Sequence, residues 1–192
     1  MRKAKISRKT NETDITVSIA INGKRKIKIN TGIGFFDHML ELFAFHGGFD
    51  LEVTGKGDLK VDCHHLIEDT GLVLGEAFRK ILGDKSSIKR YGIAFVPMDE
   101  SLSRTVIDIS GRPFIVFNSS FSQDKIGDMD TEMVKEFFHA FAQKSGITLH
   151  IETLYGENNH HICESIFKSF GQSLSEASSP KGSQIPSTKG VL

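Results

Sequence analysis

Two stretches of the chain alternate apolar and polar residues, which is the pattern of half-buried β-strands. They cover residues 12–30 (ETDITVSIAINGKRKIKIN) and residues 100–118 (ESLSRTVIDISGRPFIVFN). Each stretch has a turn signal near its middle, Asn22-Gly23 in the first and Ser110-Gly111-Arg112-Pro113 in the second. Because such turns connect adjacent antiparallel strands, each stretch predicts a β-hairpin.

Each predicted hairpin is followed by segments whose pattern changes to that of helices. A phenylalanine-rich segment that ends in glycine predicts a helix, because glycine commonly stops one. A short alternating segment then predicts a strand, and an amphipathic segment predicts a second helix. In the first copy these segments are residues 35–48, 49–55 and 64–82, and in the second they are residues 133–146, 147–156 and 160–177.

The same order of elements therefore occurs twice, which indicates an old internal duplication. Both alternating stretches open with glutamate and place a glycine at the same distance from it, Glu12 to Gly23 and Glu100 to Gly111. We expect a first half-repeat over residues 1–93 and a second over residues 94–178. Residues 179–192 are rich in Ser, Pro and Gly and predict an irregular tail, either disordered or an arm that reaches a neighbour.

Composition is that of an ordinary globular protein. Of the 192 residues, 39% are hydrophobic and 25% are charged, which suits one compact domain or two small packed ones. The 24 basic and 24 acidic residues balance, so charge gives no argument for nucleic acid or an acidic membrane surface. No stretch approaches the ~20 apolar residues of a membrane span, and the basic start lacks the apolar run of a signal peptide.

These features predict a cytoplasmic protein with no membrane partner. The two cysteines, Cys63 and Cys163, leave a disulfide open by their number alone. Nothing else in the chain indicates secretion, so we expect both thiols to be free.

Two adjacent histidines followed by a glutamate occur once in each half. On a helix the first histidine and the glutamate are four residues apart and share a face, with the second histidine beside them. Imidazole nitrogens together with a carboxylate suit Zn, Mn, Fe or Ni. Each cluster is also preceded by a histidine at what we interpret as a matching point of the repeat. The predicted ligands of two metal ions are His38, His64, His65, Glu68, His139, His160, His161 and Glu164.

Adjacent residues of a helix point about 100° apart, so one histidine pair does not easily chelate a single ion. We expect each pair to divide its rings between two ions, which places the sites where halves or subunits meet. The remaining histidines, His46 and His150, are interpreted as structural, and the phenylalanines of residues 35–45 as core packing.

Several segments together resemble the imidazoleglycerol-phosphate dehydratase family of histidine biosynthesis. They are TGIGFFDHML, DCHHLIEDTG, MDESLSRTVIDISGRPF, NNHHICESIFKSFGQSLSEA and PSTKGVL, and RKTNET at residues 8–13 resembles the family's opening motif. The resemblance implies an α+β fold of the ribosomal protein S5 domain 2-like type, in which each half packs a four-stranded sheet on helices. It also implies a homo-oligomer of 24 subunits, active sites at subunit contacts and two Mn²⁺ ions per active site.

The implied enzyme is a hydro-lyase that converts D-erythro-imidazole-glycerol phosphate into imidazole-acetol phosphate and water. The C2 proton of this substrate is not next to a carbonyl, so the substrate's own imidazole can serve as the electron sink. Two ions on its nitrogens would lower the pKa of the ring and yield an imidazolate. The imidazolate could expel the C3 hydroxyl to give a diazafulvene, whose C2 proton a carboxylate then removes.

The resemblance also assigns residues around the substrate. Glu12 matches the family's N-terminal substrate-contacting glutamate and is the leading candidate for catalytic acid/base work. Glu68 and Glu164 are less free for that role, because they are expected to bind metal. The other positions that match substrate-binding residues are Arg90, Arg112, Lys168 and the phosphate-gripping Ser187, Thr188 and Lys189.

Two other functions remain open at this stage. A dinuclear metallohydrolase would activate a water molecule and release inorganic phosphate without forming a ketone. A non-catalytic metal-binding assembly protein would keep every measurable property after Glu12→Gln. Ligand types alone do not distinguish manganese from zinc or iron.

Overall fold

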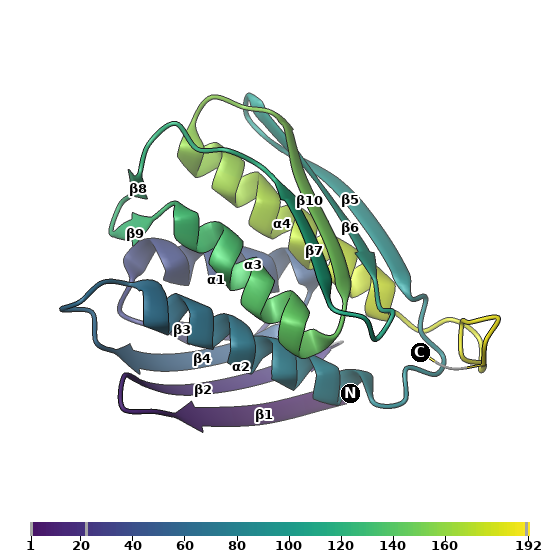
Figure 1. Ribbon diagram of the computed structural model, residues 1–192. Helices are drawn as coiled ribbons and strands as arrows, with labels where there is room; N and C mark the ends of the chain where they lie inside the picture. The colour runs from purple at the N-terminus through teal and green to yellow at the C-terminus, as the bar shows by residue number, and fades with distance from the viewer. Residues whose placement is uncertain (1, 22, 191) are drawn as a thin grey trace.

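Two four-stranded sheets enclose four helices in this protein, whose computed structural model describes residues 2–21, 23–190 and 192 (Figure 1). The first half contains β1 (Arg2–Lys9), β2 (Thr13–Ile21), β3 (Ile27–Asn30), α1 (Gly34–Gly47), β4 (Asp50–Gly57) and α2 (His64–Leu82). The second contains β5 (Tyr91–Met98), β6 (Ser101–Asp108), β7 (Phe114–Asn118), α3 (Glu132–Ser145), β10 (Thr148–Tyr155) and α4 (Asn159–Ser178). A small hairpin, β8 (Lys125–Ile126) and β9 (Met129–Asp130), is inserted before α3.

The two sheets have the same topology, and this confirms the duplicated α+β fold. The strand order is β1-β2-β4-β3 in the first sheet and β5-β6-β10-β7 in the second. All neighbours are antiparallel except β3 with β4 and β7 with β10, which are parallel. Each half is thus a hairpin followed by a strand–helix–strand unit.

The two predicted hairpins are wrong, because the strands on either side of each turn signal do not pair. Strand β4 lies between β2 and β3, and β10 lies between β6 and β7. The connection after β2 is held across the sheet instead, since Asp50 of β4 accepts hydrogen bonds from the backbone N–H groups of Lys24 and Lys26. Asn22 lies outside the described residues.

Strand β1 forms a hairpin with β2, and β5 forms the equivalent hairpin with β6. Neither β1 nor β5 was predicted from the sequence. Strand β1 buries only Ala4, and its remaining side chains are half-buried or exposed. Strand β5 exposes Ile93 and Phe95 and buries Gly92 and Ala94 instead. The second sheet begins with β5, so the predicted division at residue 93 would fall inside a strand; that division stays a prediction.

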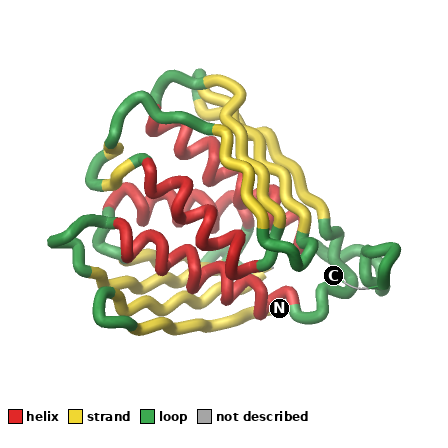
Figure 2. Tube along the Cα trace, viewed as in Figure 1, coloured by secondary structure: helices red, strands yellow, loops and turns green. Residues whose placement is uncertain are grey.

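The four layers run sheet, helices, helices, sheet, as Figure 2 shows. Helix α2 packs on β1, β2 and β4, and α1 contacts β3, while α4 packs on β5, β6 and β10, and α3 contacts β7. The helical layers then meet in crossed pairs, α1 with α4 and α2 with α3. Every helix pair between the layers therefore joins one half of the duplication to the other.

Glycines bring these helix pairs into backbone contact. A Cβ atom at Gly171 of α4 would lie 2.5 Å from the carbonyl oxygen of Phe43 on α1. A Cβ atom at Gly75 of α2 would lie 2.6 Å from the carbonyl oxygen of Phe141 on α3. The crossings are equivalent, so α4 is offset from α2 by 171 − 75 = 96 residues and α3 from α1 by 141 − 43 = 98 residues.

Candidate metal centre

Three of the predicted metal ligands come together between α1 and α4. One ligand atom each of His38, His160 and Glu164 lies within 4.8 Å of the others. The Nε2 atoms of His38 and His160 lie 3.2 Å and 3.0 Å from the same Glu164 oxygen, Oε1. The imidazole side chains are 42% and 44% exposed, whereas that of Glu164 is 10% exposed. Two half-exposed imidazole rings thus surround a largely buried carboxylate. Each Nε2 donates a hydrogen to Oε1 of Glu164, and a cation bound here would replace that hydrogen.

Lys168 neutralises this carboxylate from the next turn of α4. Its Nζ atom donates to Oε2 of Glu164 at 2.5 Å, and its side chain is only 12% exposed. Burial alone would raise the pKa of Glu164, but the hydrogen bonds from Lys168 and His38 outweigh burial and lower that pKa to about 2. The carboxylate is therefore ionised and available to a cation at neutral pH.

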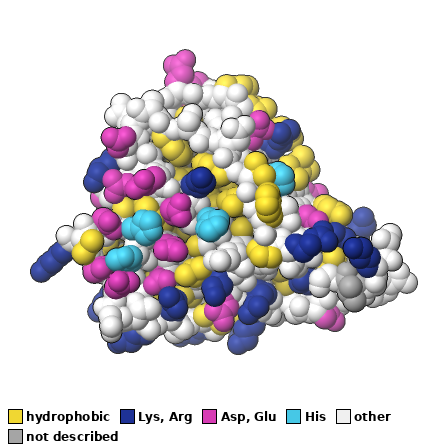
Figure 3. Space-filling model, in the orientation of Figure 1, with side chains coloured by type: hydrophobic (Ala, Val, Ile, Leu, Met, Phe, Trp, Pro, Cys, Tyr) yellow, Lys and Arg dark blue, Asp and Glu magenta, His cyan; other side chains and the backbone are white. Residues whose placement is uncertain are grey.

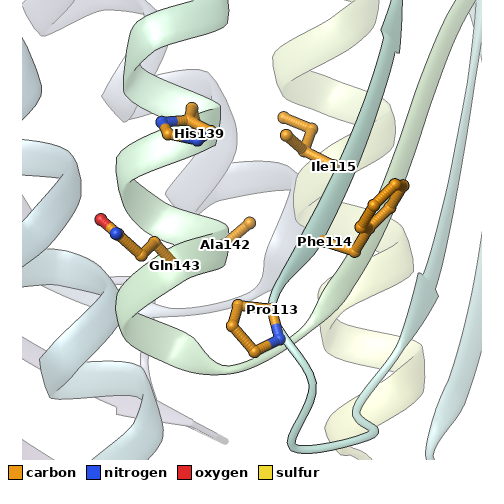
Figure 4. A pocket seen from close by; sticks show the side chains of 6 residues that line it. All are labelled: Pro113, Phe114, Ile115, His139, Ala142 and Gln143. Carbon is orange, nitrogen blue, oxygen red and sulfur yellow. The ribbon is translucent and has the colours of Figure 1, made fainter.

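The first half does not repeat this cluster among the described residues. Nε2 of His64 lies 3.6 Å from Oε2 of Glu68, but His139 does not join them. His139 instead lines a hollow between α3 and the segment Pro113–Ile115, as Figure 4 shows.

The register of the helices explains this difference. With the offset of 98 residues between α1 and α3, His38 corresponds to Glu136, since 38 + 98 = 136, and His139 corresponds to Glu41. The interpretation of His38 and His139 as matching points of the repeat is therefore wrong. His139 lies three residues further along its helix than the equivalent of His38.

The second histidine of each pair binds a carboxylate of its own. Nδ1 of His65 lies 3.0 Å from Oδ2 of Asp58, and Nδ1 of His161 lies 2.7 Å from Oε2 of Glu100. These hydrogen bonds raise the pKa of each histidine, and that from His161 lowers the pKa of Glu100. The sequence did not reveal these partners. Glu100 is 61 residues from His161, and Asp58, only seven residues before His65, lies between β4 and α2 outside any helical spacing.

Glu12 lies on the loop between β1 and β2. Its Oε2 atom is 3.9 Å from Nδ1 of His65, and its side chain is 56% exposed. The loop is tied to α2 by Asp69, which is buried and accepts from Oγ1 of Thr13 at 2.5 Å and from Nε of Arg8 at 2.9 Å. The carboxylate of Glu12 is thus free on a loop whose backbone is fixed.

The predicted phosphate-binding tail lies at the other end of α4 (Figure 1). It folds back on the segment before β5, where Arg90 donates to the carbonyl oxygen of Pro186 at 2.9 Å and pairs with Asp108 at 2.7 Å. Helix α4 has 20 residues and spans ~30 Å, with His160 near its start and the tail after its end. Among the predicted substrate-binding residues of the second half and the tail, only Lys168 lies at the cluster of His38, His160 and Glu164 within the described part of a single chain.

The surface around the histidines is acidic. Figure 3 shows histidines and Asp or Glu side chains gathered at one end of a face, and Lys and Arg side chains along its lower edge and toward the tail. Both cysteines are free and buried, as expected. Burial raises the pKa of each thiol, which disfavours the thiolate form that binds metal.

The fold and the cluster define a class: a duplicated α+β protein whose halves jointly form a nitrogen and oxygen site suited to a divalent cation. The chain belongs to the imidazoleglycerol-phosphate dehydratase family. The model of the family described as "Imidazoleglycerol-phosphate dehydratase" matches residues 31–174. The resemblance seen in the sequence is therefore confirmed, and the chain is a hydro-lyase of histidine biosynthesis.

Individual relatives agree over the full length. Proteins named imidazoleglycerol-phosphate dehydratase from Acetivibrio thermocellus and Methylorubrum extorquens are 55% and 57% identical to it, covering 100% of this chain and 99% and 100% of their own. The crystal structure of the Staphylococcus aureus enzyme matches with a TM-score of 0.85 and 41% identity, covering 93% of this chain and 99% of that one. None of the helices in the described residues is both long and apolar enough to cross a membrane.

Proposed function

We propose that this dehydratase requires divalent metal, with two Mn²⁺ ions per active site, and that His38, His160 and Glu164 bind one of them. The observation that carries the proposal is their convergence within 4.8 Å across the interface of α1 and α4. Two imidazole nitrogens and a carboxylate oxygen form a donor set that fits first-row divalent cations. The ionised state of Glu164, held by Lys168, suits the same role.

The other proposed ligands are His64, His65, Glu68, His139 and His161. We propose that they complete the two centres together with a neighbouring copy of the chain. Within one chain the tail lies across the ~30 Å length of α4 from the cluster. Because a small phosphorylated substrate cannot span a helix of that length, its imidazole and phosphate would have to contact different copies.

The outer face of the second sheet supports association, whereas that of the first sheet does not. That of the second sheet exposes the large apolar residues Tyr91, Ile93, Phe95, Phe114 and Val116. The corresponding face of the first sheet exposes lysines and other polar residues of β1, β2 and β4 instead. Apolar patches of this kind commonly mark contacts between proteins. An assembly of 24 subunits is our proposal from the family resemblance.

In the proposed mechanism, bound ions supply the Lewis acidity that lowers the pKa of the substrate imidazole. The ring N–H proton and the C3 hydroxyl would leave together as one water molecule to give a diazafulvene. Glu12 would then remove the C2 proton, giving an enol that becomes the ketone product when the ring side regains a proton. The exposed carboxylate of Glu12 is 3.9 Å from the nearest imidazole nitrogen of His65, so it is free to accept a proton. Lys168 would balance charge beside the ring, while Arg90, Arg112, Ser187, Thr188 and Lys189 would bind the phosphate.

We propose the cytoplasm as the compartment in which the enzyme acts. The two free cysteines, Cys63 and Cys163, agree with a reducing environment.

Elemental analysis combined with a ketone-product assay tests the metal proposal. The purified protein should contain manganese near two ions per chain, lose activity on chelation and recover it when Mn²⁺ is added back. Full activity in thoroughly metal-free protein would refute the metal requirement. Release of inorganic phosphate without ketone would instead identify the metallohydrolase alternative.

A further inference from the structure

The histidines His65 and His161 are each held at Nδ1 by a carboxylate. Both oxygens of Asp58 approach Nδ1 of His65, at 3.0 and 3.2 Å, and one oxygen of Glu100 approaches Nδ1 of His161 at 2.7 Å. An ionised carboxylate only accepts hydrogen bonds, so each Nδ1 must carry the hydrogen. In the neutral ring the lone pair is then on Nε2, the atom left free to bind a metal ion.

Glu100 is itself fixed in place. Its other oxygen, Oε1, accepts from the backbone N–H groups of Asn158 at 2.9 Å and Glu157 at 3.2 Å. The hydroxyl of Ser101 donates to the same oxygen at 2.9 Å. Glu100 therefore connects the start of β6 to the start of α4 and holds the ring of His161 in one orientation.

The two halves reach this arrangement through residues that are not equivalent. Strands β2 and β6 begin at residues 13 and 101, an offset of 88, so Glu100 corresponds to Glu12. Glu12 stays 3.9 Å from His65, and Asp58 contacts that ring instead. With the offset of 98 between β4 and β10, which begin at residues 50 and 148, Asp58 corresponds to Gly156.

We propose that Asp58 and Glu100 are positioning residues, each of which holds a histidine with its Nε2 atom free for metal. Because Asp58 occupies Nδ1 of His65, it also leaves Glu12 uncommitted. This inference rests on the proposed metal centres. Outer-shell carboxylates of this kind fix the tautomer and orientation of metal-binding imidazoles, and their loss typically costs roughly 10–100-fold in metal affinity.

The Glu100→Gln variant gives the sharpest test. Its amide oxygen would remain on the backbone N–H groups of residues 157 and 158, which turns the amide N–H toward Nδ1 of His161. A donor at that place favours the tautomer with hydrogen on Nε2, the wrong one for metal binding. Asp58→Asn can still offer its oxygen to His65, so it should have a smaller effect than Asp58→Ala.

The experiment measures the Mn²⁺ affinity of the full-length, chelator-treated protein by isothermal titration calorimetry, together with its urea unfolding midpoint without metal. Glu100→Gln and Asp58→Ala should each weaken Mn²⁺ binding by roughly 10–100-fold while the unfolding midpoint is retained. Glu157→Gln is the charge-matched control, because this side chain makes no hydrogen bond within the described residues.

The outcomes separate the two proposals. Unchanged affinity in both Glu100→Gln and Asp58→Ala, or an equal loss in Glu157→Gln, would overturn the positioning roles alone, provided that His160→Ala abolishes binding. Wild-type protein that binds no Mn²⁺, or that binds it equally well after His160→Ala, would overturn the metal centre and this inference with it.

Discussion

The Nε2 atom of His38, in the first half of the duplication, lies 3.2 Å from Oε1 of Glu164, in the second half. The contact exists because α1 of the first half packs on α4 of the second half. His38 lies in the early part of α1, and Glu164 lies in the early part of α4. Duplication has thus produced a site that neither half contains alone.

Glu164→Gln should weaken Mn²⁺ binding by more than the roughly 10–100-fold that loss of an outer-shell partner costs. Glutamine keeps the shape of the side chain, but it removes the negative charge on which His38, His160 and Lys168 converge. Equilibrium dialysis with Mn²⁺ measures the change. Glu176→Gln, the same substitution near the end of the same helix, should bind as the wild type does, and parallel losses in both variants would contradict the assignment.

Glu12→Gln should lower kcat by about 10²–10⁴-fold, the range for loss of a general acid or base. The Mn²⁺ affinity should change little, because the carboxylate of Glu12 is not part of the three-residue cluster. Steady-state assay of ketone formation measures kcat. Asp14→Asn is the control, since Asp14 is exposed near the same loop and, among the described residues, forms an ion pair only with Lys9. A kcat within twofold of wild type in Glu12→Gln would remove it from the acid/base step.

The sequence predicted the helices and the central strands, because their faces are fixed by local periodicity. It failed on pairing: alternation in β2 and β3 shows which side chains are buried, but not that β4 lies between these strands. Strand β5 was missed because its large apolar residues Ile93 and Phe95 face outward and its inward-facing positions include the small residues Gly92 and Ala94. Its sequence therefore lacks the usual pattern of apolar residues inside and polar residues outside.

The candidate site divides in the same way. His160 and Glu164 share a helix face by spacing alone, so the sequence predicts their contact. The contact of His38 with them depends on how α1 and α4 cross. The position of His139, three residues beyond the equivalent of His38, follows only from the 98-residue offset between α1 and α3, which the packing of the helices reveals. The contact of Glu100 is set by tertiary structure, and that of Asp58 by the fold of the loop between β4 and α2, so neither follows from a helix or strand periodicity.

Asp128→Ala should destabilise the protein by about 1 kcal/mol, because Asp128 caps α1 from the inserted hairpin of the other half. Its oxygens accept from the backbone N–H groups of Gly34 at 2.7 Å and Phe35 at 3.1 Å. Urea unfolding followed by circular dichroism measures the difference. Asp124→Ala, an exposed substitution in the same insert, should change the free energy of unfolding by less than ~0.5 kcal/mol.

The pH dependence of this cap follows from the lowered pKa of Asp128. Burial alone would raise that pKa, but the N–H groups of Phe35 and Gly34 outweigh burial and lower it. A lowered folded-state pKa stabilises the protein above the unfolded-state value, near 3.8, and that stability is lost as the pH falls through the folded value. The difference between wild type and Asp128→Asn should therefore be present at pH 7 and disappear toward pH 2. A difference that stays constant across this range would show that charge contributes nothing to the cap.

Gly171→Ala should destabilise the fold by about 1–3 kcal/mol and weaken metal binding together. The added methyl group would lie 2.5 Å from the carbonyl oxygen of Phe43 and 3.0 Å from the backbone nitrogen of Gly47, so α4 must move away from α1. That movement separates His160 and Glu164 from His38, although none of the three is substituted. Thermal unfolding and Mn²⁺ titration measure the two effects.

Gly34→Ala is the matched control, because the nearest atom to its Cβ is 3.6 Å away and the backbone there is unstrained. If Gly171→Ala lowered stability but bound Mn²⁺ with wild-type affinity, the spacing of α1 and α4 would not determine the geometry of the cluster.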